Sequence, residues 1–164
     1  MKTYESFSRI YDRYWGERSI SFLPLVREHL LSLVPFGVRI LDLCCGTGQV
    51  AAILQGDGFS VTGVDASNSM LRMARKRVPK EAFIHCDVRC FRQENSFNGA
   101  ICLYDSLNHI MSIDDLKAVF CNVLHSLVRG GRFGFDLNTE SKYLMGWYIS
   151  TGRWGGDICG CSYA

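Results

Sequence analysis

The stretch 39–50, RILDLCCGTGQV, joins a short apolar segment to a glycine turn and then to a helical pattern. Its first half is apolar except near its ends, which is typical of a buried parallel strand. Gly46 and Gly48 remove the Cβ atoms that would keep a ligand away from the backbone, and the following helix turns unpaired N–H groups toward the same place. Asp42 lies on the strand just before the turn. The stretch therefore predicts a ligand-binding turn at the end of a strand.

Strand and helix patterns alternate after this turn. Strands are predicted at 40–44, 60–64, 82–86, 99–103 and 132–137, and helices at 50–55, 67–78 and 114–128. Such alternation predicts right-handed βαβ units. The expected fold is α/β, a Rossmann-like, doubly wound, mostly parallel sheet with helices on both faces. Asp42, Asp65 and Asp87 each follow or end a strand, so they are expected to line one edge of the sheet, where ligands bind in such folds.

The chain is predicted to be a single domain, 1–164. Residues 1–36 form a helical N-terminal cap, residues 37–137 form the ligand-binding core, and residues 138–164 form an irregular, glycine-rich and aromatic tail that begins a substrate-binding region. A sheet that ends at its fifth strand leaves an unpaired edge. We therefore expect a truncated chain, an incompletely represented one, or a homodimer through the uncovered edge.

Composition excludes several classes of function. The net charge of +2 does not favour nucleic acid, and no apolar run is long enough to predict a membrane span. The polar N-terminus predicts no secretory leader, so a cytoplasmic protein is expected. The eight cysteines include no CxxC pair, which favours reduced thiols over a disulfide framework and predicts no metal site. The basic run from Arg72 to Lys80 predicts a solvated helix face, with phosphate contact as the alternative.

The glycine turn alone does not identify its nucleotide. Gly46, Gly48 and Ala51 satisfy the pattern GxGxxG/A, and Asp65 follows at the distance of a ribose-binding acid, which suits NAD, FAD or an adenosyl ligand. The carboxylate of Asp42 repels a pyrophosphate and attracts an ammonium group. Asp87 adds an acceptor for an adenine amine. Three acids around one turn therefore favour a cationic, adenine-bearing ligand, S-adenosylmethionine.

Several segments together resemble the class I S-adenosylmethionine-dependent methyltransferases. The segment 40–48, ILDLCCGTG, is similar to their motif I, and 64–71, 86–88 and 128–133 resemble the segments after the second and third strands and before the fifth. The segment 4–12, YESFSRIYD, resembles the N-terminal motif of a small-molecule subgroup. Cys44 departs from the pattern, since many members have glycine at this position.

The resemblance implies a role for each matching residue. Asp42 and the backbone of Gly46 and Gly48 would hold the methionine part, and Asp65 would accept both ribose hydroxyls. The remaining implied cofactor residues are Ala66 and Met70 against adenine, Asp87 and the Val88 N–H at the adenine edge, Tyr11 over the methionine end, and Cys44 and Leu103 beside them. Ordinary core packing is the alternative for Met70 and Tyr11.

The loop after the fourth predicted strand is expected to face the transferred methyl group. His109 is the candidate general base, because histidine titrates in the useful range. A histidine that only caps or packs at a helix start is the alternative. Tyr104 and Asp105 are expected to orient a small-molecule substrate for N- or O-methylation. A non-catalytic or truncated adenosyl-binding module and an NAD-dependent oxidoreductase are the competing interpretations.

Overall fold

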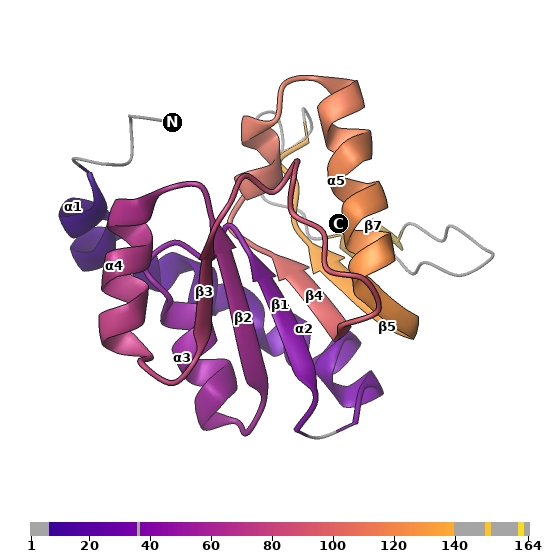
Figure 1. Cartoon of the computed structure of the whole chain (residues 1–164), viewed down its shortest axis with the longest axis horizontal. Helices are drawn as coiled ribbons and strands as arrows, with labels where there is room; N and C mark the ends of the chain where they lie inside the picture. Colours follow the sequence, from indigo (N-terminus) through magenta and orange to yellow (C-terminus); the bar gives the residue numbers. More distant parts are fainter. Residues whose placement is uncertain (1–6, 36, 140–149, 152–160, 163–164) are drawn as a thin grey trace.

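Five parallel strands form one sheet in the order β3-β2-β1-β4-β5 (Figure 1). The computed structural model describes residues 7–35, 37–139, 150–151 and 161–162. The strands are β1 (Arg39–Leu43), β2 (Ser60–Asp65), β3 (Ala82–His85), β4 (Phe97–Cys102) and β5 (Leu127–Phe135). This confirms the predicted α/β fold and places the first four predicted strands within two residues of their expected bounds, whereas β5 begins five residues earlier than predicted.

The central strand β1 pairs in parallel with β2 on one side and with β4 on the other. Leu43 at its end pairs with Val64 of β2 and with Cys102 of β4. Chain order reverses between β1 and β4, because β2 and β3 lie on one side of β1 and β4 and β5 on the other. A crevice for a ligand is expected at this switch point, beyond the carboxyl ends of the strands.

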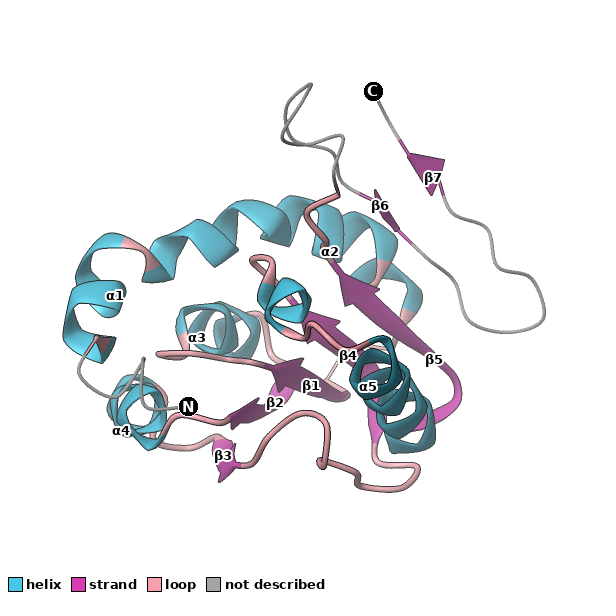
Figure 2. Ribbon diagram, turned by 90° about the horizontal axis from the view of Figure 1, so that it is seen from above, coloured by secondary structure: helices cyan, strands magenta, loops and turns pink. Residues whose placement is uncertain are grey.

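Helices cover both faces of the sheet. Buried side chains of α2 (Leu23–His29), α3 (Gln49–Gly56) and α4 (Asn68–Arg77) join one core cluster, and those of α5 (Ile113–Ser126) join the other. Figure 2 shows α5 on the opposite side of the sheet from α3. Ile40 of β1 belongs to the first cluster and Leu41 to the second, as the alternation of a strand requires.

The N-terminal segment is helical in four short pieces. These are α1 (Ser8–Tyr14), the 3-10 helix η1 (Gly16–Phe22), α2 and the 3-10 helix η2 (Leu31–Leu33). Gly16 begins η1, and a Cβ there would lie 1.9 Å from Nε2 of Gln49, so a larger residue would have to displace the Gln49 side chain. Pro24 lies in the first turn of α2, as predicted.

The predicted boundary between the last helix and the fifth strand is wrong. The glycine pair 130–131 was expected to end the helix, but α5 ends at Ser126 and β5 begins at Leu127. The carbonyls of His125 and Ser126 accept hydrogen bonds from the N–H groups of Asn95 and Ser96, both at 2.9 Å, which ends the helix there. The register then shifts, and Gly130, with φ of +81°, takes part in the irregularity.

Most of the tail 138–164 lies outside the described residues. Two described pieces of it, β6 (Ser150–Thr151) and β7 (Cys161–Ser162), pair antiparallel. Among the described strands β5 pairs along one side only, with β4, and a homodimer through this edge stays a prediction. In the described part of the chain, no helix combines the length and apolar character needed to cross a membrane.

Candidate active site

A cavity of about 440 Å³ opens at the carboxyl edge of the sheet. The predicted site residues that line it are Tyr11, Cys44, Gly46, Asp65, Ala66, Met70, Asp87, Val88, Tyr104, Asp105 and His109. Asp42, Gly48 and Leu103 do not line it. The lining residues that the sequence did not indicate are Arg89, Ser106, Ile110, Met111, Ser112 and Asp115. The topology therefore brings eleven of the fourteen predicted site residues to one cavity.

The glycine turn has an unusual backbone at three positions. Cys44 and Gly46 have φ of +55° and Gly48 has φ of +81°. The left-handed conformation at Cys44 explains why glycine suits this position, since a side chain there carries strain. A Cβ at Gly46 would lie 3.6 Å from Cε1 of Tyr11, so the tyrosine ring lies against the turn.

Gly48 has a packing role. It is the N-cap residue of α3, and a Cβ there would lie 3.0 Å from Cβ of Ala74. The close approach of α3 and α4 therefore requires glycine at this position. A contact of its backbone with the methionine part of a ligand stays a prediction.

The carboxylate of Asp65 is held in one orientation by the backbone. Its Oδ2 accepts the N–H of Gly46 at 2.9 Å, and its Oδ1 accepts the N–H of Ser67 at 2.8 Å. Burial raises the pKa of Asp65, while these two hydrogen bonds act in the opposite direction. Each carboxylate oxygen has a second lone pair, so the side chain retains capacity to accept hydroxyl groups.

Asp42 lies behind the cavity wall and is only 3% exposed. Its Oδ2 is buried without a hydrogen-bond partner among the described residues. Burial first, and the charge of Asp65 second, raise the pKa of Asp42 to about 8. A buried acid with an orphaned oxygen beside a second acid gains from a nearby cation, and this is the property that a ligand ammonium group requires.

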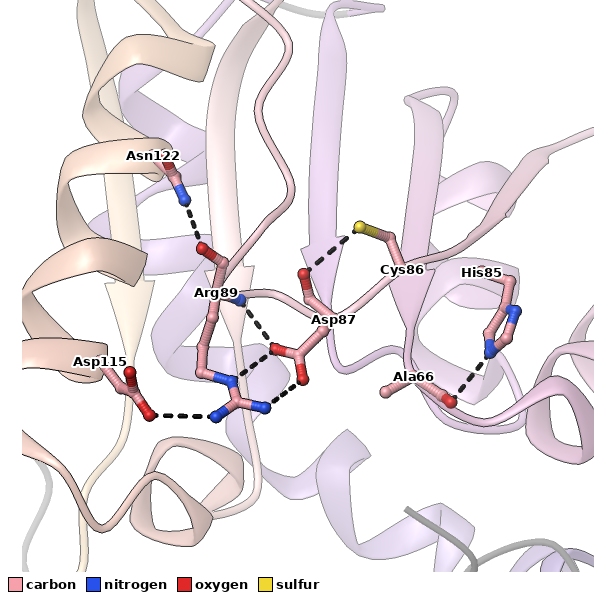
Figure 3. A network of polar contacts seen from close by, with 7 residues as sticks. All are labelled: Ala66, His85, Cys86, Asp87, Arg89, Asp115 and Asn122. Atoms are coloured by element: carbon pink, nitrogen blue, oxygen red, sulfur yellow. Dashed lines mark hydrogen bonds and ion pairs between the residues drawn. The ribbon is translucent and has the colours of Figure 1, made fainter.

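Asp87 already has a partner that the sequence analysis missed (Figure 3). Arg89 donates to it from its backbone N–H at 2.9 Å, from Nε at 3.0 Å and from a terminal nitrogen at 2.7 Å. The other terminal nitrogen of Arg89 donates to Asp115 at 3.0 Å. These contacts hold the pKa of Asp87 below its usual range and join β3 to the first turn of α5. Asp87 therefore keeps limited capacity for an adenine amine.

The loop after β4 carries two consecutive left-handed residues. Tyr104 has φ of +61° and Asp105 has φ of +49°, although neither is glycine. Oδ2 of Asp136 accepts the Asp105 N–H at 2.7 Å, and Asn138 donates to Asp105 at 2.6 Å. His109 ends the 3-10 helix η3 (Ser106–His109), where it is exposed and lines the cavity.

Asp136 is thus a site residue that the sequence analysis missed. It was placed inside the predicted strand 132–137, whereas β5 ends at Phe135, so Asp136 follows a strand like the other acids. It is buried, and burial raises its pKa. With the end of the fifth strand predicted at Phe135, Asp136 would have been recognised as an acid that follows a strand. For Arg89, the signal was its position two residues after a strand-end acid.

The family profile described as "Methyltransferase domain" matches residues 40–131, more than half of the chain and the whole glycine turn. The chain belongs to the class I S-adenosylmethionine-dependent methyltransferases. A putative methyltransferase of Geobacillus sp. (strain WCH70) is 31% identical over 149 residues, covering 85% of this chain and 59% of the relative. The NAD-dependent oxidoreductase interpretation is therefore set aside.

Two further comparisons extend this similarity. A dTDP-4-amino-2,3,4,6-tetradeoxy-D-glucose N,N-dimethyltransferase of Saccharopolyspora spinosa is 28% identical over 128 residues, covering 78% of this chain and 50% of the relative. The crystal structure of an S-adenosylmethionine-dependent methyltransferase from Clostridium acetobutylicum ATCC 824 matches with a TM-score of 0.69 and 25% identity, covering 98% of this chain and 78% of that one. The chain spans between half and three fifths of the length of the curated relatives described here.

Among the described residues, no three histidine, cysteine, aspartate or glutamate side chains gather in a group that could hold a metal ion. The polar groups of the cavity are instead carboxylates, one guanidinium, one imidazole and hydroxyls. Groups of these kinds can bind a ligand by charge and hydrogen bonds.

Proposed function

We propose that the chain binds S-adenosylmethionine in the cavity at the sheet edge and transfers its methyl group to a nitrogen or oxygen atom of a small molecule. The observation that carries the proposal is the buried pair of acids at the glycine turn, Asp42 with an orphaned oxygen and Asp65 with its carboxylate fixed by two N–H groups. Such a pair favours a ligand with a cationic end and adjacent hydroxyls.

The residues of the cavity fit this cofactor. We assign the ammonium end to the field of Asp42, the ribose hydroxyls to Asp65 and the adenine to Met70 and Ala66. Asp87 and the Val88 N–H are assigned to the adenine edge, and Tyr11, which lies against Gly46, to the methionine end. When bound, S-adenosylmethionine supplies an electrophilic methyl group.

The acceptor side of the cavity is formed by Tyr104, Asp105 and His109. We assign proton removal from the acceptor to His109, because its imidazole lines the cavity and histidine is the side chain that most often serves as a general base. Asp105, whose carboxylate is oriented by Asn138, is assigned to acceptor binding together with Tyr104. An amine acceptor suits this acidic wall, and the relative from Saccharopolyspora spinosa is described as an amino-sugar N,N-dimethyltransferase.

Calorimetric titration with S-adenosylhomocysteine tests cofactor binding. Binding is expected, with a loss of about tenfold or more in Asp65→Asn, because charge-assisted hydrogen bonds are lost. The absence of binding by folded protein at millimolar ligand contradicts the proposal.

Turnover is tested by incubation with S-adenosylmethionine and amino-sugar nucleotides. His109→Ala is expected to slow methyl transfer by about 10² or more, as loss of a general base does. His125→Ala is the matched control, since His125 lies on α5 outside the cavity and bonds the carbonyl of Cys121. Cofactor binding without turnover of any acceptor would support the non-catalytic module instead.

A further inference from the structure

A second cavity, of about 430 Å³, lies between α1 and α4. It is lined by Ser8, Arg9, Asp12, Ser69, Arg72, Met73, Lys76 and Arg77. None of these residues lines the cavity assigned to the cofactor. Four cationic side chains and one acid make this cavity basic, in contrast to the acidic cavity at the sheet edge.

One of the four cations is already compensated. Arg77 pairs with Asp12 and donates from Nε to the carbonyl of Thr47, in the glycine turn, at 3.0 Å. Arg9, Arg72 and Lys76 make no ion pair with any described residue. The cavity therefore holds three positive charges that the described fold does not neutralise.

The basic side chains of α4 do not all line this cavity. Arg75 points elsewhere and donates to the carbonyl of Phe83 at 2.8 Å, and Lys80 follows the end of α4. Arg72 and Lys76, one turn apart on α4, line the cavity together with the compensated Arg77 and with Arg9 of α1. Arg72, Lys76 and Lys80 are all exposed, as a solvated helix face predicts, but only Arg72 and Lys76 also line the cavity between α1 and α4.

We propose that this cavity binds a small phosphate-bearing anion of the diphosphate class, which bridges α1 and α4. Two guanidinium groups and one ammonium group suit phosphate oxygens, because guanidinium binds them in bidentate geometry. A diphosphate carries enough negative charge to neutralise three cations. The volume also lies in the range of small-ligand sites.

This inference goes beyond the proposed methyl transfer, because the anion is neither cofactor nor acceptor. Without an anion, Arg9 on α1 repels Arg72 and Lys76 on α4. An anion removes that repulsion and holds α1 against α4. Since α1 also carries Tyr11, which lies against Gly46, the bound anion strengthens binding of an adenosyl ligand.

Titration of the protein with sodium pyrophosphate at an ionic strength of about 0.1 M, where the Debye length is about 10 Å, tests the site. Saturable one-to-one binding is expected, and Arg72→Gln and Lys76→Gln each weaken it by about tenfold. Lys80→Gln removes the same charge outside the cavity and leaves the affinity within about twofold, because a distant exposed charge is screened. No saturable binding, or an equal loss in Lys80→Gln, overturns the proposal.

Titration with S-adenosylhomocysteine, with and without saturating pyrophosphate, tests the link to Tyr11. The affinity is expected to rise several-fold with pyrophosphate, and this rise is lost in Arg9→Gln. An unchanged affinity overturns the link, and displacement of pyrophosphate by S-adenosylhomocysteine overturns the separate site. If S-adenosylhomocysteine does not bind at all, the proposed function fails, and the pyrophosphate titration still decides the anion site.

Discussion

Asp42 makes the binding of a cationic ligand depend on pH. Burial and the charge of Asp65 raise the pKa of Asp42 to about 8, from an ordinary value of 3.8. Keeping this carboxylate ionised in the folded, ligand-free protein therefore costs about 6 kcal/mol relative to an unperturbed acid. A cation in the adjacent cavity favours the ionised form, so binding of S-adenosylhomocysteine should release a proton from Asp42.

The size of this effect follows from the ionised fraction. With a pKa of about 8, the fraction of Asp42 that is ionised rises about fifty-fold between pH 6 and pH 8. If the ligand binds only to the ionised form, its affinity rises by the same factor, at most tenfold per pH unit. The ammonium group of the ligand stays mostly charged between pH 6 and pH 8, so its own titration contributes little to the pH dependence of the affinity.

Calorimetry at pH 6, 7 and 8, in buffers that differ in ionisation enthalpy, measures both the affinity and the released proton. Asp42→Asn should remove the pH dependence. 5′-Methylthioadenosine is the control ligand, because it lacks the ammonium group and should bind with little pH dependence. Equal slopes for wild type and Asp42→Asn would refute the assignment of the proton to Asp42.

The same shift predicts the pH dependence of unfolding. Folded Asp42 keeps a proton that the unfolded chain loses above about pH 4, so the free energy of unfolding should fall as pH rises from about 4 to about 8. Urea denaturation across this range should show the slope in the wild type and a smaller one in Asp42→Asn. A slope that is the same in both proteins would place the titrating group elsewhere.

Two further substitutions test the packing and the polar contacts. Gly48→Ala should lower the free energy of unfolding by about 2–4 kcal/mol, from a left-handed backbone and overpacking together. Gly130→Ala has the same φ of +81° but no atom within 4 Å, so urea denaturation should show only the backbone cost. Arg89→Gln should weaken S-adenosylhomocysteine binding about three- to tenfold, because the Asp87 carboxylate loses its orientation. The control Arg92→Gln, which breaks an exposed ion pair with Glu94, should leave the affinity for S-adenosylhomocysteine unchanged. Tighter binding in Arg89→Gln would mean that Arg89 competes with the ligand for Asp87.

The sequence predicted the fold where local and long-range preferences agree. Short apolar strands that end in an acid or a glycine turn are buried on both faces, so their period and length are informative. The boundary between α5 and β5 was mispredicted because the helical apolar pattern continues through Leu127 into Val128. Pairing of Leu127 with Phe97 and capping of the helix carbonyls by Asn95 and Ser96 decide the boundary, and neither is local in sequence.

The candidate site was predictable to a similar extent. The glycine turn and the acids at strand ends are local motifs, and the topology brings them together. Arg89, which was missed, lies only two residues after Asp87, its main partner, whereas its second partner, Asp115, is 26 residues away and is brought beside it by the fold. The two left-handed residues, Tyr104 and Asp105, were also missed, because the Asp105 N–H is held by Asp136, which follows the neighbouring strand β5 and lies 31 residues away in sequence.

Four acids lie at or just after strand ends, and they differ in their hydrogen-bond partners within the fold. This difference distinguishes acids that support the cavity loops from one suited to bind a ligand. Asp65 accepts the backbone N–H groups of Gly46 and Ser67, and Asp87 accepts that of Arg89. Asp136 accepts the Asp105 N–H with one oxygen and so holds the loop after β4. Their carboxylates therefore fix the turns that shape the cavity. Asp42 and Asp136 each have a buried oxygen with no partner among the described residues. Asp136 supports a loop through its other oxygen, whereas burial and the charge of Asp65 raise the pKa of Asp42 to about 8. Burial of an unsatisfied acid costs stability, so its position at the glycine turn is best explained by a cationic ligand that compensates it.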